Sequence, residues 1–480
     1  MNLAMDMTNP FLALDQHPPE AIAAIDDAGE ALSYGELNRQ AAALAGAIPA
    51  GSLIFILCEN SLSALIGYVA CLSHHIVPLL LDSQPDRQLL ERLIATYHPG
   101  WLWRPQADSG PDPAARMTLG RYELVATGLP PFPLHPSLAL LVSTSGSTGS
   151  PRLVRLSAAS IEANAQSIAR YLAIDRHERA VVNLPMHYVY GLSIINSHLL
   201  RGATLLLTSK TLAQRAFWQF VQRYGGSSLA GVPYTYQMLQ RIGFMQMALP
   251  TVKTLTQAGG KLSPALHQAF ARYARQHHKA FIVMYGAAEA TARMAWLPAA
   301  ESLTKCGSIG QAIPGGRLVL LDAQGRETEA CGQTGELVYY GPNVMLGYAQ
   351  CGADLSKGDE LQGRLVTGDI ARRDEAGFFS IVGRKSRFAK LFGRRIALDE
   401  LEMLIRSAFP GAECACLSDD RQLRLFMEPA CPADEIKRFI CQKMRLSPSA
   451  IVAQRVTALP RSASGKILYR ALEACSGQPE

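Results

Sequence analysis

The sequence predicts an α/β fold, because short apolar runs alternate with helical patterns through most of the chain. Apolar runs that suit buried strands or helices occupy residues 64–72, 138–143 and 202–207. The segment 157–173 lies between two of these runs and repeats apolar residues at helical spacing. Alternation of this kind is typical of sheets whose faces are covered by helices.

From about residue 316 onward, the pattern changes to strands joined by tight turns. Residues 317–325 and 335–341 are predicted strands, and residues 378–383 follow the turn Asp-Glu-Ala-Gly. Basic residues gather directly after Gly383, before a compact final segment of about a hundred residues. This change of composition predicts a domain boundary.

Size and charge narrow the class of protein. At 480 residues, the chain has room for about three domain-sized units. Apolar residues make up 48% and charged residues 18%, which predicts a soluble globular protein. The net charge of +6 comes without a dense basic block, so anionic small molecules are favoured over nucleic acid as partners. The ten cysteines lack zinc or disulfide spacing, which indicates reduced thiols.

The N-terminal part predicts neither export nor membrane insertion. The chain starts without the basic stretch and apolar stretch of a signal peptide. The apolar region 52–81 is interrupted by charged and polar residues and by Pro78, so a buried helix and strand are expected there. The predicted location is the cytoplasm, with no membrane partner.

A loop rich in serine and glycine, residues 143–152, carries the strongest local signal. Small residues let the backbone approach a polyphosphate, and hydroxyl and N–H groups can bind its charge. The pattern differs from the G-x-x-x-x-G-K-[ST] loop of phosphate-loop NTPases, and a surface linker is the alternative interpretation. The residues expected to bind ATP here are Thr144, Ser145, Gly146, Ser147, Thr148, Gly149 and Arg152.

This loop resembles the [ST]-S-G-[ST]-T-G-x-P-K loop of the adenylate-forming superfamily, which includes acyl-CoA synthetases, nonribosomal peptide synthetase adenylation domains and luciferases. Further motifs of that superfamily follow in order, and the resemblance spans residues 33 to 470. Any single motif is a weak signal, whereas six in order are specific. The matching segments are Tyr285–Glu289, Gly335–Leu337 with Gly341, Gly347 and Tyr348, Thr367–Asp369, Gly383–Arg384 with Gly393 and Glu402, and Pro460 with Gly465–Lys466.

The resemblance implies a specific architecture. A large N-terminal domain, residues 1–383, is expected to combine layered α/β subdomains with a small β-rich subdomain and to bind ATP and the acid. A small, mobile α+β domain, residues 384–480, is expected to carry the catalytic lysine. Ser386 stands at the hinge position, where the family usually has Asp or Lys, and a small polar residue can still absorb backbone rotation.

The resemblance also implies a reaction. A carboxylic acid attacks the α-phosphorus of ATP, pyrophosphate leaves, and the acyl group passes from acyl-AMP to a thiol. The thiol belongs to coenzyme A or to the phosphopantetheine of a carrier protein. Two alternatives stay open: an amide ligase with an amine acceptor, and a degenerate protein that binds nucleotide or acyl-adenylate without turnover.

Three residues are predicted to be catalytic. Lys466 would supply a mobile positive charge where two anions meet. Glu289 would help to hold Mg²⁺, which prefers oxygen ligands. Arg384 would contact the ribose or a phosphate. Further nucleotide contacts are expected from Asp369 to the ribose hydroxyls, from Tyr285 to adenine, and from Gly259, Gly260 and Gly286.

Two departures from the family pattern bear on the nucleotide. Arg152 replaces the usual lysine, which keeps the charge but changes its geometry. Ala288 replaces the threonine of Y-G-x-T-E and removes a hydroxyl that contacts the α-phosphate in the family. Slower adenylation is one expected consequence, and the same alanine favours the degenerate alternative.

The acid-binding segment predicts an uncharged aryl or acyl carboxylic acid. Relatives that activate α-amino acids carry Phe-Asp where this chain has Tyr188 and Val189, and a buried ammonium without a carboxylate is costly. The segment 185–191 is more similar to that of aryl and acyl ligases, and His187 in it is expected to be structural. Gly191 and Gly259 are expected to leave space for a bulky acid. The predicted acid-binding residues are Tyr188, Val189, Tyr190, Gly191, Val232, Tyr234 and Ala258.

Overall fold

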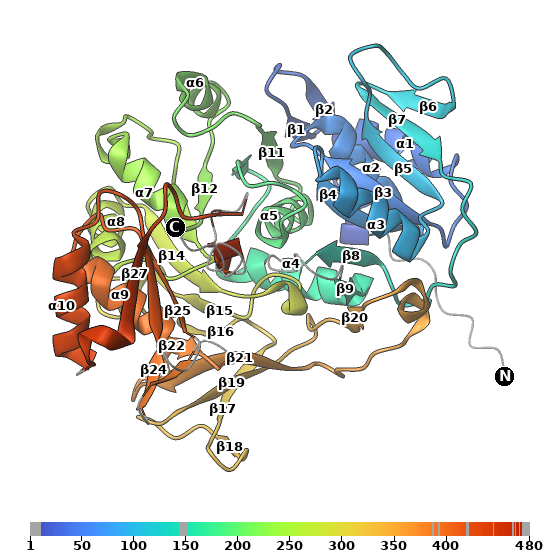
Figure 1. Cartoon of the computed structure of the whole chain (residues 1–480). Helices are drawn as coiled ribbons and strands as arrows, with labels where there is room; N and C mark the ends of the chain where they lie inside the picture. Colours follow the sequence, from blue (N-terminus) through green and yellow to red (C-terminus); the bar gives the residue numbers. More distant parts are fainter. Residues whose placement is uncertain are drawn as a thin grey trace.

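The computed structural model in Figure 1 places two large sheets, a smaller antiparallel sheet and a C-terminal unit along one chain. It describes residues 11–143, 152–385, 388–391, 394–418, 422–444, 446–462, 465, 467–469 and 471–472.

The first large sheet has eight strands and a parallel centre formed by β5, β3, β4 and β8. Its strands, in sheet order, are β20 (Gly347–Ala349), β9 (Leu153–Leu156), β8 (Leu140–Ser143), β4 (Val77–Asp82), β3 (Leu53–Cys58), β5 (Trp101–Pro105), β7 (Tyr122–Ala126) and β6 (Ala115–Leu119). Every residue of β3 is buried; Ile54 and Ile56 join one hydrophobic cluster, whereas Phe55 joins another. Both faces of the sheet are therefore covered, as parallel strands require.

The second large sheet has nine strands. In sheet order they are β16 (Gln311–Ala312), β15 (Ala295–Leu297), β14 (Ala280–Tyr285), β13 (Thr254–Gln257), β12 (Ser228–Gly231), β10 (Arg179–Val182), β11 (Thr204–Leu207), β1 (Ile22–Ile25) and β2 (Ala31–Ser33). The neighbours β10, β12, β13 and β14 run parallel, so their carboxyl ends meet at one edge. In open parallel sheets, ligands bind outside that edge.

Helices fill the space between the two sheets and cover their outer faces. Residues of α1 (Tyr34–Ala45), α2 (Leu62–Ser73), α4 (Ala158–Tyr171) and α5 (Val189–Leu199) join the hydrophobic cluster that both sheets share. Residues of α6 (Arg215–Arg223), α7 (Pro233–Arg241) and α8 (Pro264–Gln276) pack on the other face of the nine-stranded sheet. The helix α3 (Arg87–Tyr97) packs on the other face of the eight-stranded sheet. The result is a layered α/β arrangement.

A five-stranded antiparallel sheet follows. In sheet order it contains β18 (Glu327–Thr328), β17 (Arg317–Leu321), β19 (Thr334–Tyr340), β21 (Arg364–Arg373) and β22 (Phe379–Arg384). Short 3-10 helices occur elsewhere in the described chain: η1 (Phe11–Gln16), η2 (Phe244–Gln246), η3 (Ala288–Ala290), η4 (Ala299–Glu301), η5 (Gly352–Ser356) and η6 (Pro448–Ala450).

The C-terminal unit, orange to red in Figure 1, has hydrophobic clusters of its own. It contains β23 (Phe388–Leu391), β24 (Arg394–Ala397), α9 (Leu398–Ala408), β25 (Cys414–Ser418), β26 (Leu423–Met427), α10 (Ala433–Met444) and β27 (Ile451–Arg455). It contacts α7 of the large part, where Gln237 Nε2 donates to Glu413 Oε1 at 3.4 Å.

The predicted fold class is confirmed. The helix expected within 157–173 is α4, whose N-cap Ser157 forms a capping box with Ser160. The run 64–72, open to either interpretation in the sequence, lies inside α2. No helix in the described ranges is long and apolar enough to span a bilayer.

Candidate active site

Asp369 and Arg384 form the first half of the predicted nucleotide site. They are directly opposite each other on the neighbouring strands β21 and β22. Arg384 Nε donates to Asp369 Oδ1 at 3.0 Å, and Asp369 is only 7% exposed. Although burial acts to lower the pKa of the Arg384 guanidinium, Asp369 and other nearby groups raise it above its usual value. The cross-strand register thus fixes a charged pair that motif spacing alone could not place.

Tyr285 completes this group from a different sheet. It ends β14, and its hydroxyl donates to Asp369 Oδ2 at 2.5 Å. Burial, and then the charge of Asp369, raise the pKa of Tyr285 well above its usual range, so the phenol stays protonated and donates. Both carboxylate oxygens of Asp369 are therefore oriented before any ligand binds.

Glu289 and Arg152 meet through Tyr348, a residue that motif reasoning did not assign to the site. The Tyr348 hydroxyl donates to Glu289 Oε1 at 2.7 Å, and the Arg152 guanidinium carbon lies 3.8 Å from the centre of the Tyr348 ring. A planar guanidinium stacks on an aromatic face better than an ammonium does, which gives a physical account of arginine at this position. The predicted loop residues 144–149 lie outside the described residues.

Two residues of the segment before Glu289 have clear structural surroundings. A Cβ built on Gly286 would lie 1.8 Å from the carbonyl oxygen of Ala292, so only glycine fits there. Ala288 begins η3 and is half-buried against the main hydrophobic cluster.

The mouth of the predicted acid pocket is made by residues that follow parallel strands. Val232 follows β12, whereas Ala258, Gly259 and Gly260 follow β13. A Cβ built on Gly259 would lie 2.8 Å from the Tyr188 hydroxyl and 3.1 Å from Val232 Cγ1. The structure therefore brings Tyr188, Val232 and Gly259 together. A Cβ on Gly260 would touch Pro233 Cγ at 3.0 Å.

The expectation that Gly191 and Gly259 leave space is wrong. A Cβ on Gly191 would lie 2.3 Å from the Pro185 carbonyl oxygen, so this glycine serves a close backbone approach. The space beside Gly259 is already occupied by Tyr188 and Val232. Glycine at these two positions reflects packing rather than room for a ligand.

The residues at and just before the start of α5 have different surroundings. Tyr190 is 2% exposed and its hydroxyl donates to Thr256 Oγ1 at 2.9 Å. Val189 lines a small cavity of about 10 Å³ against α4, together with Asn164 and Thr291. His187 Nε2 lies 3.7 Å from Asp82 Oδ2, and burial lowers the pKa of His187.

A segment of the C-terminal unit closes over this mouth. A Cβ built on Gly465 would lie 3.1 Å from Tyr234 Cβ and 3.5 Å from Val232 Cγ2. Arg461 holds the segment, because its guanidinium donates to the Gly465 carbonyl at 3.0 Å and to Glu413 at 2.6 Å. Lys466 and Ser386 lie outside the described residues. The neighbour of the predicted catalytic lysine thus lies at the acid mouth.

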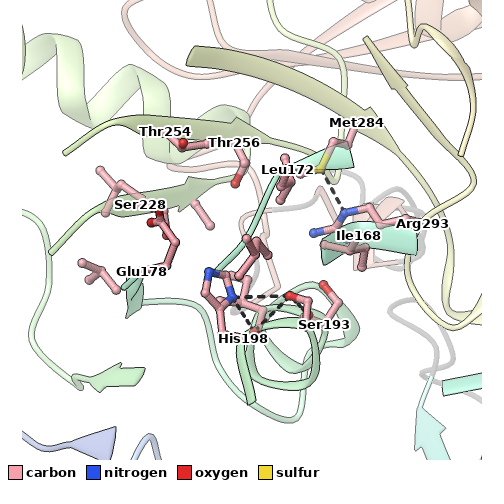
Figure 2. Close-up of a pocket in the computed structure, with 16 residues that line it drawn as sticks. Ile168, Leu172, Glu178, Ser193, His198, Ser228, Thr254, Thr256, Met284 and Arg293 are labelled. Atoms are coloured by element: carbon pink, nitrogen blue, oxygen red, sulfur yellow. Dashed lines mark hydrogen bonds between the residues drawn. The ribbon is translucent and has the colours of Figure 1, made fainter. Parts of the chain in front are cut away.

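Behind the mouth lies a larger cavity of about 30 Å³, shown in Figure 2. Its walls come from α4, α5 and strands β10, β12, β13 and β14. Arg293 stands at one end and Glu178 at the other, and Arg293 is only 3% exposed. Nothing in the motif pattern marks Arg293, which follows Glu289 by four positions.

Comparison with known proteins identifies the family. The sequence description of the AMP-binding enzyme family matches residues 12–349. The chain belongs to this family. It is therefore a member of the adenylate-forming superfamily, and its predicted class, AMP-forming acid–thiol ligase, is confirmed.

Curated relatives and solved structures agree with this assignment. The chain is 29% identical to sulfoacetate–CoA ligase of Cupriavidus necator, over 82% of this chain and 80% of that protein. It is 26% identical to 2-succinylbenzoate–CoA ligase of Bacillus licheniformis, over 70% and 69%. The fold is similar to O-succinylbenzoate coenzyme A synthetase from Bacillus subtilis in complex with AMP, with a TM-score of 0.78, 20% identity and coverage of 97% and 98%.

Proposed function

We propose that this enzyme is an acid–CoA ligase that makes acyl-CoA in two steps. In the first, a carboxylate oxygen of the acid attacks the α-phosphorus of ATP, and pyrophosphate leaves with its electron pair. In the second, the thiol of coenzyme A, after losing its proton, attacks the acyl carbon and AMP leaves. The observation that carries the proposal is the Asp369 carboxylate, held by Tyr285 and Arg384 beside the carboxyl edge of the parallel strands.

Each residue would have its own contact with ATP or the acid. Asp369 would accept the ribose hydroxyls, and Arg384 would donate to the ribose or a phosphate. Tyr285, fixed by its hydroxyl, would present its ring to adenine. Lys466 would bring positive charge to the reacting carboxylate and phosphate, and the position of Gly465 against Val232 and Tyr234 supports this role.

Glu289 is the candidate ligand for Mg²⁺. Within the part of the chain that the structure describes, no group of three His, Cys, Asp or Glu side chains could hold a metal by itself. A single carboxylate suits Mg²⁺, which is commonly bound through one or two carboxylates, water and substrate phosphates. The ion would neutralise phosphate charge, while Tyr348 orients the Glu289 carboxylate.

The second step is proposed to need a rearrangement of the C-terminal unit. In this structure, Gly465 lies against Val232 and Tyr234 at the acid mouth, an arrangement that suits adenylation. Rotation of residues 384–480 about Ser386 would withdraw Lys466 and admit the thiol. Separate hydrophobic clusters on the two sides of this boundary support it as a domain boundary.

Acid-dependent pyrophosphate release tests the proposal. The purified chain, with ATP and Mg²⁺, should release pyrophosphate with at least one acid of a broad panel and form acyl-CoA when coenzyme A is added. Pyrophosphate release without acyl-CoA formation would move the acceptor to a carrier protein or an amine. No release with any acid would favour the degenerate binding protein, which Ala288 already suggests.

A further inference from the structure

Arg293 is a buried cation with no acidic partner among the described residues. Its Nε lies 3.3 Å from Met284 Sδ, and its guanidinium carbon lies 4.0 Å from the centre of the Tyr190 ring. The Tyr171 hydroxyl is also within hydrogen-bonding reach of it. No ion pair recorded in the described part of the chain includes Arg293.

A second buried arginine, Arg155, shows which partners a structural guanidinium has in this protein. Arg155 is fully buried and is paired with Glu360, and it also donates to the carbonyl groups of Tyr348 and Gly358 at 3.3 Å. Arginine stays protonated in proteins, so burying it costs free energy unless an anion compensates. Arg155 has the half-exposed Glu360 as its anion, whereas the contacts of the Arg293 guanidinium among the described residues are aromatic and sulfur groups and include no anion.

Arg293 faces a cavity whose walls are mainly apolar and include a few small polar groups, as Figure 2 shows. Ser193, Ser197 and Thr256 are on its walls, and His198 is also there. Burial lowers the pKa of His198 to about 4, so this ring is neutral near pH 7 and does not compete for an anion. The acidic residue on the described walls, Glu178, lies at the opposite end and accepts a hydrogen bond from the Ser227 hydroxyl.

Two strands of the nine-stranded sheet lead from the cavity to the acid mouth. Ala230 and Thr256 line the cavity, two positions before Val232 and Ala258 on the same strands. Tyr190 lies close to residues of both places: the guanidinium carbon of Arg293 is 4.0 Å from the centre of its ring, and that centre is 6.3 Å from the ring centre of Tyr188. A volume of about 30 Å³ open to water-sized groups suits the small terminal group of a substrate.

We propose that Arg293 binds a second anionic group of the acid substrate, a carboxylate or sulfonate at the end opposite the carboxylate that is adenylated. This inference rests on the proposed function and names the substrate class: a dianionic acid. It replaces the sequence-based expectation of an uncharged organic group. A bidentate guanidinium–oxyanion pair would supply the missing counter-charge.

Matched acids test the proposal on the wild-type enzyme. Pyrophosphate release is measured for dicarboxylic acids of increasing length, for sulfo-carboxylic acids of the same lengths, and for the corresponding monomethyl esters. We expect kcat/KM for the best anion-ended acid to exceed that of its ester by at least about 30-fold, the lower range for a buried charge pair. The comparison of the two anionic series tells carboxylate from sulfonate.

Variants assign the preference to Arg293. Arg293→Met should abolish the preference, mainly through KM for the anionic acid, whereas Arg293→Lys should keep part of it. Arg275→Met, on the exposed face of α8, is the matched control and should keep the wild-type ratio. Thermal unfolding shows whether each variant is folded, and if Arg293→Met is not, the wild-type series and Arg293→Lys decide.

Two results would overturn the inference in different ways. If the wild-type enzyme activates the esters or plain monocarboxylic acids at least as well as the dianions, the inference fails while the ligase function stands. If no acid of any series releases pyrophosphate, the proposed function fails and the inference falls with it.

Discussion

The two ends of the site differ in how their charges are compensated. The nucleotide end comprises Tyr285, Glu289, Tyr348, Asp369 and Arg384. The acid end comprises Tyr188, Tyr190, Val232, Gly259 and Arg293. At the nucleotide end, Asp369 accepts hydrogen bonds from Arg384 and Tyr285, and Glu289 accepts one from Tyr348. At the acid end, Arg293 is buried beside a cavity and forms no ion pair with an acidic residue among those described.

This difference shows how one fold can keep a reaction and change its substrate. The groups that we propose bind ATP are oriented by protein partners, so they are ready for a ligand that is common to the whole family. The group that we propose binds the acid is left for the ligand to neutralise, so recognition there would depend on the chemistry of the acid. Each of the following tests can confirm or contradict this difference between the two ends.

The largest effect is expected where the two ends meet. Lys466→Ala should slow acyl-adenylate formation by roughly 10²–10⁴-fold, because a positioned charge in the transition state is lost. Binding of ATP should change much less, since the proposed nucleotide contacts of Tyr285, Asp369 and Arg384 remain in the variant. Rapid-quench measurement of acyl-adenylate checks this, with Lys443→Ala on α10 as the control. Adenylation at the wild-type rate would remove Lys466 from the mechanism.

A second test adds the wrong charge to the acid end. An α-amino analogue of the accepted acid should be activated at least ~100-fold less well, because Val189 stands where a carboxylate would be needed to pair with its buried ammonium. The α-hydroxy analogue is the matched control, with similar size and no charge. The measurement is kcat/KM for pyrophosphate release. If the amino acid is the better substrate, the acid end contains an anion that the described residues do not reveal.

The third test removes a compensated charge from the nucleotide end. Asp369→Asn should raise KM for ATP by roughly 10–100-fold, because hydrogen bonds to a charged acceptor are stronger than neutral ones. Asp374→Asn is a suitable control, since Asp374 pairs with Lys305 just beyond the end of the same strand. An unchanged KM for ATP in Asp369→Asn would move the ribose site elsewhere.

The smallest expected change restores a missing hydroxyl. Ala288→Thr should hold or raise the adenylation rate, by about tenfold at most, which is the upper range for one neutral hydrogen bond. The rate constant for the first turnover is the measurement, with Ala287→Thr as the neighbouring control. Loss of activity in a folded Ala288→Thr enzyme would mean that this half-buried alanine makes room for the substrate.

The prediction of the nucleotide end rests on local rules. Glycine and hydroxyl residues after an apolar run, and a tyrosine and a glutamate four positions apart, are signals within a few residues of sequence. Their order along the chain pointed to the family, and the family match over residues 12–349 confirms it. Pattern reasoning also placed α4 and distinguished the strand-rich part from the layered part.

The acid end could not be predicted in the same way, because tertiary packing decides it. Gly191 looked like space for a ligand, yet the Pro185 carbonyl fills that position. The partner of Glu289 at the nucleotide end also depends on tertiary packing, because Tyr348 lies 59 residues farther along the chain, on β20, which pairs with β9.

The sequence by itself determined the fold class, the order of the motifs and the reaction family, since these depend on periodicity and on residues close together in the chain. The partners of Asp369, which are Arg384 and Tyr285, and the cavity that Arg293 faces became known from the folded chain alone. The physical reason is that the cost of a buried charge depends on what surrounds it in space. Arg155 and Arg293 are both buried arginines, but Arg155 is paired with the carboxylate of Glu360, whereas Arg293 has no acidic partner among the described residues.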